Sequence, residues 1–268
     1  MLSNFSVETA KLIAICTFLV SLVAGNVHQK MQLPLDPVTY CDPNQKKGVL
    51  TIGMVDKTDR FQDGEAAFIL KQLHEIESEA KTNDHLTIFK IGPDVKRFGT
   101  PKPLFNMCKP PDGSEANGIS EGKIAFQRNF EKKFKTPFEN ALQFVGREEQ
   151  YNTSQIFELT ASLKNREEVQ NADNIRLIIF SNGVQNSVGV SQYPKSDVYF
   201  KLFSEFQKSP YFKGMNFGDF LKKTNIKIIY LVSKETEPYQ TIENRDFLIQ
   251  LFKSVGARSV QLIDHKTY

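Results

Sequence analysis

The sequence predicts one α/β domain with a mostly parallel central sheet that helices cover on both faces. Apolar runs of strand length alternate along the chain with amphipathic helical patterns, which is the order that builds a parallel sheet. The strand-like runs are apolar at consecutive positions, as in strands whose two sides are both buried. We expect this domain to span residues 48–268.

Residues 1–27 predict a signal peptide or a membrane anchor that forms an N-terminal hydrophobic helix. The run from Leu12 to Val27 is uncharged and follows Lys11. No face of the run is polar, which argues against a helix packed on a domain surface. Its length falls between the apolar core of a signal peptide and a spanning helix of about 17–25 residues, so cleavage and retention both stay open. Either outcome places the domain outside the cytoplasm, in a periplasmic or extracellular compartment.

The composition predicts a folded domain with a mixed surface. Of the 268 residues, 40% are hydrophobic and 22 are Phe, so the chain can bury a substantial core. The 34 basic and 31 acidic residues leave a formal net charge of +3 without a basic block. Nucleic-acid binders carry a dense basic stripe, so we expect no nucleic-acid partner.

The first part of the domain predicts two strands with a helix between them. Residues 28–47 contain three prolines and little periodicity, which indicates a linker before the first strand. The strands are the apolar runs Val49–Val55 and His85–Gly92. Apolar residues between them recur at helical spacing, at Phe68, Ile69, Leu73 and Ile76.

The middle of the chain predicts a returning strand and a long helical region. Residues 93–118 are rich in Pro, Gly and Lys, with a short strand expected at Pro103–Met107. Apolar residues at intervals of three or four follow, at Phe126, Phe130, Phe134, Phe138, Leu142 and Val145. We expect Thr136-Pro137 to divide this pattern, with Thr136 as the N-cap and Pro137 at the first helical position. Another helix is expected from Ser154.

The last part predicts three further strands separated by helices. The strands are expected at Arg176–Gly183, Ile226–Lys234 and Ser259–Asp264. Helical Phe and Leu patterns lie in the connections, at Val198–Phe206, Phe217–Leu221 and Ile242–Val255. Gly256 is expected to end the last helix.

Three polar loops fall where such a sheet places its functional groups. Asp56–Asp59 follows the first strand, Asn152–Gln155 opens a helix, and Ser181–Gly183 follows a later strand. In open α/β sheets, ligands bind outside the carboxyl ends of the strands. We therefore expect these loops to meet at one edge of the sheet.

The order and setting of these loops resemble the metal-ion-dependent adhesion site of the von Willebrand factor A domain. That family combines an Asp-x-Ser-x-Ser loop, a distant Thr and an Asp in a Ser-Asp-Gly-like turn, and its oxygen ligands suit Mg²⁺. The resemblance covers about residues 48–264. It implies four metal ligands: Asp56 as the first Asp, Thr58 as the first Ser, Ser154 as the distant hydroxyl and Asn182 at the third-loop Asp.

Two departures from the family pattern imply that Mg²⁺ binds weakly or not at all. Arg60 stands where the second Ser belongs and brings a cation, and Asn182 lacks the charge of an Asp. Asp59 either restores that charge or pairs with Arg60, and Thr153 is the alternative to Ser154. The remaining residues of the implied binding face are Asp59, Arg60, Thr153 and Ser181. Simpler roles stay open, since Thr153 or Ser154 can cap a helix and Asn182-Gly183 is a good turn at positive φ.

The resemblance implies a protein-binding domain of scaffold or adhesion type and not an enzyme, because in the family a carboxylate of the partner completes the metal coordination. The partner would be a protein, and the N-terminal segment would contact the membrane. Two other classes stay open. Haloacid-dehalogenase-like phosphatases also carry a late Ser-Asn-Gly motif, but their nucleophile loop needs Asp-x-Asp, and Thr58 occupies the second position. The third class is a structural subunit of an envelope assembly.

The sequence also predicts a disulfide between Cys41 and Cys108. Cys16 lies in the N-terminal apolar segment, which leaves two cysteines in the exported part. Disulfides persist outside the cytoplasm. If Pro103–Met107 returns antiparallel beside the second strand, Cys108 arrives near the start of the first strand, where the linker carries Cys41. The alternative is two unrelated buried thiols.

Overall fold

The structure is a computed structural model, and it describes residues 36–42, 48–61, 64–92, 101–114, 122–147, 151–232 and 236–266. The predicted signal peptide or anchor at 1–27 lies outside the described residues, as does most of the linker at 28–47. Within these ranges, no helix combines the length and the apolar character needed to cross a membrane.

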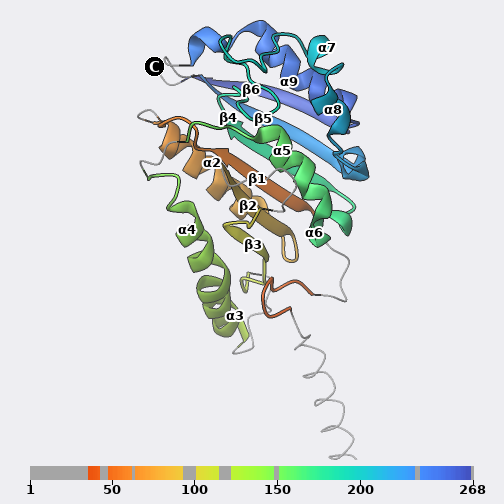
Figure 1. Cartoon of the computed structure of the whole chain (residues 1–268). Helices are drawn as coiled ribbons and strands as arrows, with labels where there is room; N and C mark the ends of the chain where they lie inside the picture. Colours follow the sequence, from red (N-terminus) through yellow and green to blue (C-terminus); the bar gives the residue numbers. More distant parts are fainter. Residues whose placement is uncertain are drawn as a thin grey trace, which may run out of the picture.

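A six-stranded, mostly parallel sheet forms the centre of the fold, in the order β3-β2-β1-β4-β5-β6 (Figure 1). Only β3 runs antiparallel, against β2; the other neighbours in the sheet are parallel. The strands are β1 Leu50–Asp56, β2 His85–Ile91, β3 Phe105–Cys108, β4 Ile175–Ser181, β5 Thr224–Val232 and β6 Ser259–Lys266. The predicted α/β class with a mostly parallel sheet is therefore confirmed.

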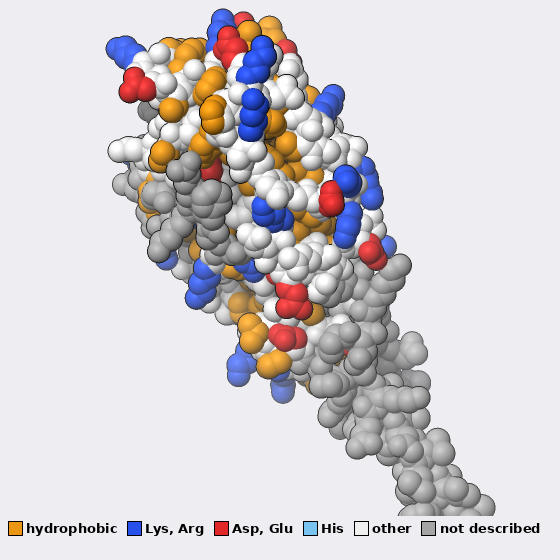
Figure 2. All heavy atoms as spheres, turned by 45° about the vertical axis from the view of Figure 1, so that its right-hand side comes forward, with side chains coloured by type: hydrophobic (Ala, Val, Ile, Leu, Met, Phe, Trp, Pro, Cys, Tyr) orange, Lys and Arg blue, Asp and Glu red, His pale blue; other side chains and the backbone are white. Residues whose placement is uncertain are grey.

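Helices cover both faces of this sheet. The α-helices of the described residues are α2 Glu65–Glu79, α3 Gly122–Phe130, α4 Thr136–Leu142, α5 Ile156–Ser162, α6 Glu167–Gln170, α7 Phe203–Phe206, α8 Pro210–Gly214 and α9 Ile242–Ser254. Helices α2, α3 and α4 pack on one face, and α5, α7 and α9 pack on the other. Figure 2 shows that charged side chains of both signs are spread over one side of the molecule, as the balanced composition predicts.

The central strand β1 shows why the runs are apolar at consecutive positions. Successive side chains of a strand point to opposite faces. Ile52 and Met54 pack in the cluster under α5 and α9, while Val55 packs in the cluster under α2. Each side chain of this size stabilises the fold by about 1.5–3 kcal/mol when fully buried, so both faces of β1 hold the two helix layers in place.

The helix division expected at Thr136 is not present. Helix α3 continues through a π-helical turn, Glu131–Lys135, directly into α4, and Lys135 has helical backbone angles. Proline lacks the N–H that closes an α-helical turn, and the wider turn before Pro137 accommodates this loss without a break. Three aromatic rings on the buried side, Phe130, Phe134 and Phe138, stack on one another and hold the continuous helix against β3.

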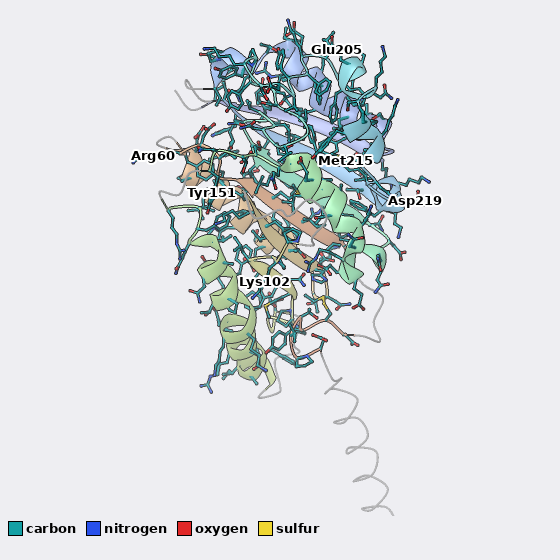
Figure 3. All side chains as sticks on the ribbon, viewed as in Figure 1. Arg60, Lys102, Tyr151, Glu205, Met215 and Asp219 are labelled. Carbon is teal, nitrogen blue, oxygen red and sulfur yellow. A yellow bond between two sulfur atoms is a disulfide. The ribbon has the colours of Figure 1, made fainter. Side chains whose placement is uncertain are left out.

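A disulfide ties the segment before β1 to the edge of the sheet. Cys41 and Cys108, the pair that the sequence predicts, are bonded with a Cα separation of 4.9 Å (Figure 3). The backbone N–H of Cys108 also donates to the carbonyl of Thr39 at 2.7 Å. Because Cys108 pairs with His85 at the start of β2, this attachment lies at the amino edge of the parallel strands.

Candidate functional site

The candidate site lies at the carboxyl edge of the sheet, between β1 and β4. These neighbouring strands are parallel, so Asp56 at the end of β1 and Ser181 at the end of β4 reach the same edge. Ser154, which precedes α5, comes to the same place. Arg60, labelled in Figure 3, is at this edge, where β6 also ends near the C-terminus marked in Figure 1.

Asp56 is the centre of the site because four donors converge on its carboxylate. Thr58 donates to Oδ1 from its backbone N–H at 3.0 Å and from its hydroxyl at 2.9 Å. Ser154 and Ser181 each donate a hydroxyl to Oδ2 at 2.7 Å. Asp56 is only 4% exposed, so this hydrogen-bond network replaces the water that a surface carboxylate would have.

Burial raises the pKa of Asp56 above its usual value, although the hydrogen bonds from Ser181, Ser154 and Thr58 oppose the rise. The negative charge is therefore less stable here than in water. A cation beside the carboxylate would lower the pKa again, because an opposite charge favours the ionised form.

Asn182 contacts Asp59 and makes no hydrogen bond to Asp56. Its side-chain N–H donates to the carboxylate of Asp59, and its Oδ1 accepts from the backbone N–H of Val184 at 2.9 Å. Gly183 follows with φ 71°, so the polar turn expected from the sequence is present. Asn182 thus closes its own turn and fixes the loop after β1 at the same time.

A cavity of about 20 Å³ lies among these loops and is large enough for one water molecule or ion. It is lined by Asp56, Thr58, Asp59, Arg60, Phe61, Glu65, Asn182 and Leu231. Ser154 and Ser181 contact Asp56 from outside this lining. Thr153, the alternative to Ser154, is not part of the Asp56 network. Its hydroxyl oxygen is buried, and within the described residues it has no hydrogen-bond partner.

The residues present fit Mg²⁺ only in part. The hydroxyls of Thr58, Ser154 and Ser181 donate hydrogen bonds to Asp56. Their oxygens therefore keep lone pairs, and Mg²⁺ prefers such hard oxygen ligands. However, Asn182 donates its amide N–H to the carboxylate of Asp59, which would otherwise add negative charge to the metal site. Arg60 lines the cavity where the family places a hydroxyl. This donor set predicts weak binding of the ion.

Lys57 anchors the loop after β1 to the segment that follows α4, a role that the sequence did not reveal. It is 1% exposed, and its ammonium donates to the carbonyls of Val145 at 3.2 Å and Arg147 at 2.8 Å, just beyond α4. The ammonium also lies 4.3 Å from the centre of the Phe61 ring. Cations bind well at the carbonyl-rich end of a helix. Lys57 therefore positions Asp56 and Thr58 from the opposite side of the loop.

Two tyrosines extend the site along the carboxyl edge, and sequence reasoning missed them. The rings of Tyr193 and Tyr239 meet edge to face with centres 4.8 Å apart. Burial raises the pKa of Tyr193 to about 12, and the negative charge of Asp59, in the loop after β1, adds to the rise. Gln240, beside Tyr239, donates to the carbonyl of Asn182 at 2.9 Å. One sequence feature could have pointed to these tyrosines: each lies next to a proline, at Tyr193-Pro194 and Pro238-Tyr239, in a loop that follows a strand.

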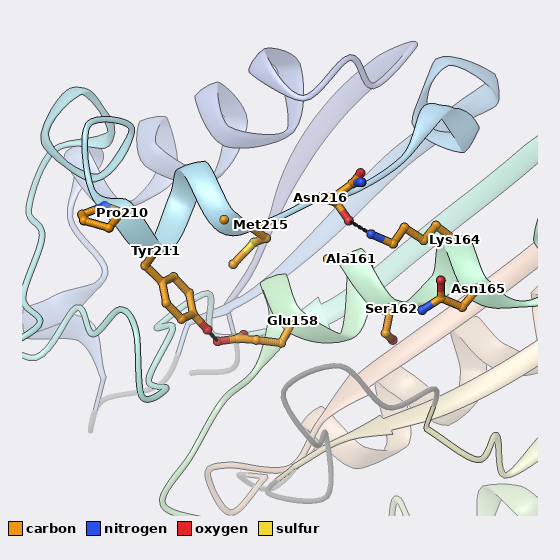
Figure 4. Close-up of a pocket in the computed structure, with 10 residues that line it drawn as sticks. Glu158, Ala161, Ser162, Lys164, Asn165, Pro210, Tyr211, Met215 and Asn216 are labelled. Carbon is orange, nitrogen blue, oxygen red and sulfur yellow. Dashed lines mark hydrogen bonds between the residues drawn. The ribbon is translucent and has the colours of Figure 1, made fainter.

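A separate cavity of about 370 Å³ lies between α5 and α8 (Figure 4). Two pairs of its polar groups are hydrogen-bonded to each other. Tyr211 donates its hydroxyl to Glu158 at 2.5 Å, and the ammonium of Lys164 donates to the carbonyl of Asn216 at 2.6 Å. None of the residues implied by the sequence lines this cavity, so it is distinct from the strand-end site.

Comparison with known proteins gives a limited result. No family model matches the sequence, and no curated protein matches it. Among solved structures, the chain is similar to an aerotolerance-related membrane protein from Bacteroides fragilis, with a TM-score of 0.35 and 10% identity over 81% of this chain and 92% of that chain. At this TM-score the similarity supports no inference about function.

Proposed function

We propose that the chain is a membrane-tethered or exported, von Willebrand A-like domain that binds a protein through the carboxyl edge of its sheet. One observation carries this proposal. Asp56 gathers Thr58, Ser154 and Ser181 into a single network at the strand ends, and these are the loops that resemble the family's adhesion site. The uncharged run Leu12–Val27 supports the tether or export.

The surroundings of the network suit a protein partner. Tyr193 and Tyr239 are partly exposed beside it, and Arg60 is exposed. Tyr and Arg are enriched among the residues that dominate the energetics of protein interfaces. Another cavity, of about 60 Å³, at Tyr199, Phe200 and Tyr239 continues the aromatic surface.

Binding is favoured over catalysis by the state of Asp56. A phosphatase needs an approachable carboxylate nucleophile with a second acid two residues later. Here both oxygens of Asp56 accept hydrogen bonds in a buried position, and Thr58 occupies the place of the second acid. We therefore expect no phosphatase activity, and no observation favours a purely structural subunit over a binding domain.

Mg²⁺, if bound, would be held by Asp56, Thr58 and Ser154, and it would supply a positive centre for an acidic group of the partner. The amide of Asn182 and the guanidinium of Arg60 oppose this. We propose that the dissociation constant for Mg²⁺ is about 10 mM or larger and that the partner binds without depending on the metal.

Photocrosslinking tests the binding face. A photoreactive residue introduced at Arg60 should give discrete adducts with a partner in the native membrane or exported fraction, because this edge is the proposed contact. Tyr193→Ala should reduce those adducts at least about fivefold, as expected for an interface residue that contributes more than about 1 kcal/mol.

The matched control for this experiment is the same photoreactive residue at Lys222, which is 71% exposed and lies two residues before β5 at the amino edge. Adducts that form equally from positions 60 and 222 would exclude the carboxyl edge as the specific contact. Unchanged adducts in a folded Tyr193→Ala protein would exclude the aromatic surface.

Restoring the family ligands should reveal the metal site. In Arg60→Ser/Asn182→Asp, 10 mM Mg²⁺ is expected to raise the unfolding free energy by about 1–2 kcal/mol, because a ligand that binds only the folded state stabilises it by mass action. The unmodified protein should gain well under about 1 kcal/mol. Thermal melts with and without Mg²⁺ at matched ionic strength measure both values, and an equal response of the two proteins would argue against the assignment of Arg60 and Asn182.

A further inference from the structure

A second group of potential ligands lies at the opposite, amino edge of the sheet. Cys108 and His85 are directly paired across β3 and β2, and Cys41 is bonded to Cys108. The two sulfurs and one ring nitrogen of His85 lie within 4.8 Å of one another. Cys108 and His85 are buried at 1% and 5% exposure.

His85 is held in the tautomer that a metal ligand requires. Its Nε2 lies 2.7 Å from Oδ1 of Asn106, and the hydroxyl of Thr87 donates to the same oxygen at 2.8 Å. An amide oxygen only accepts hydrogen bonds, so Nε2 carries the proton and Nδ1 has the lone pair. That Nδ1 lies 3.7 Å from Sγ of Cys41. Metal-bound histidines in proteins are typically oriented by such a contact from the other ring nitrogen.

We propose that reduction of the Cys41–Cys108 disulfide creates a zinc site made of Cys41, Cys108 and His85. A dithiol reductant gives two electrons and two protons to the bridge, which becomes two thiols, and the dithiol leaves as its own disulfide. Zn²⁺ then replaces the two thiol protons and binds two thiolates and Nδ1. Asn106 acts through His85 as a positioning residue.

One ligand distance, between Cys41 and His85, already fits tetrahedral zinc, and the two sulfurs must move to about 3.8 Å apart once the bridge is reduced. With Zn–S near 2.3 Å and Zn–N near 2.0–2.1 Å, a tetrahedral ion separates sulfur and nitrogen by about 3.6 Å. The observed separation of Cys41 Sγ and His85 Nδ1 is 3.7 Å. Two thiolates and one imidazole leave a fourth position for water, and this donor set selects zinc over the hard cation proposed for the carboxyl edge.

The test uses the full-length chain with Cys16→Ser, so that only two thiols are present. The protein is reduced with a phosphine, which takes an oxygen atom from water and leaves as its oxide while the water supplies both thiol protons. It is then titrated with Co²⁺ as a spectroscopic probe and competed with Zn²⁺. We expect one Co²⁺ per chain with thiolate-to-cobalt charge-transfer absorption, displaced by Zn²⁺. The oxidised protein should bind neither ion at this site. His85→Asn should weaken binding at least about tenfold, while His74→Asn, a histidine on α2, should leave it unchanged.

Circular dichroism of the reduced protein establishes that it is folded before the metal is added. Reduced, folded protein without the charge-transfer band would overturn the proposal, as would equal affinities of the His85→Asn and His74→Asn proteins. If reduction unfolds the chain, Zn²⁺ should restore the native spectrum, and failure to do so counts equally against the site. None of these outcomes depends on a partner binding at the carboxyl edge.

Discussion

Asp56→Ala is expected to lower the free energy of unfolding by about 3 kcal/mol, because it removes the acceptor of four hydrogen bonds. The hydroxyls of Ser154 and Ser181 and the N–H of Thr58 would remain buried without that acceptor, and each buried, unsatisfied polar group costs about 1–3 kcal/mol. Urea denaturation measures the loss. Asp219→Ala, at an exposed carboxylate (Figure 3), is the control and should change stability by less than about 0.5 kcal/mol. Equal stability of the two variants would mean that the network does not support the fold.

The pH dependence of the unfolding free energy distinguishes the effect of the charge of Asp56 from the effect of its hydrogen bonds and packing. Its pKa is raised in the folded protein, so the folded state holds the proton more tightly than the unfolded chain does. By linkage, the stability from this group is fully present below the unfolded pKa of about 3.9 and is lost as pH rises through the folded pKa. Asp56→Asn has no such titration. The stability difference between wild type and Asp56→Asn should therefore shift against the wild type as pH rises from about 4, and a difference independent of pH would contradict the burial argument.

Removing the disulfide with Cys41→Ala/Cys108→Ala is expected to cost about 4 kcal/mol under oxidising conditions. The bridge closes a loop with a sequence separation of 67 residues, and a loop of this length restricts the unfolded chain by roughly that amount. For a chain of this size the melting temperature should fall by about 10 °C. The double variant leaves no unpaired thiol at either position.

Wild-type protein treated with a phosphine provides the internal comparison for this prediction. Without added metal it should melt close to the double variant, because both lack the covalent loop. A double variant as stable as the oxidised wild type would show that the bridge adds nothing to the fold.

Most of the sheet was predictable because its strands are buried on both sides. The runs around Ile52, Ile178 and Ile228 are apolar on both faces of the sheet, so these strands can be recognised in the sequence without knowing how they pack. The π-helical turn before Pro137 was not predictable, because proline at a first helical position normally marks a start. Here the stacked rings of Phe130 and Phe134 pack against β3 and outweigh that local preference.

The site was predictable only as far as position along the chain determines it. Asp56 and Ser181 end parallel neighbouring strands, so their meeting follows from topology. Whether Ser154 or Thr153 contacts Asp56 depends on the direction in which two adjacent hydroxyls point, and no periodic pattern in the sequence predicts that direction. Lys57 was missed because its partners, the carbonyls of Val145 and Arg147, lie 88 and 90 residues away.

The bridge between Cys41 and Cys108 has a mechanical consequence. Strands β1 and β2, with Asp56 at the end of β1 and Arg60 after it, lie inside the covalent loop that the bridge closes. Tension applied to the chain before Cys41 passes mainly through the sulfur–sulfur bond to Cys108 and on toward α3, because this path is far shorter than the one through residues 42–107. Pulling from the N-terminal side therefore leaves the strand-end loop largely unstretched, and only reduction of the bridge would expose that loop to the full load.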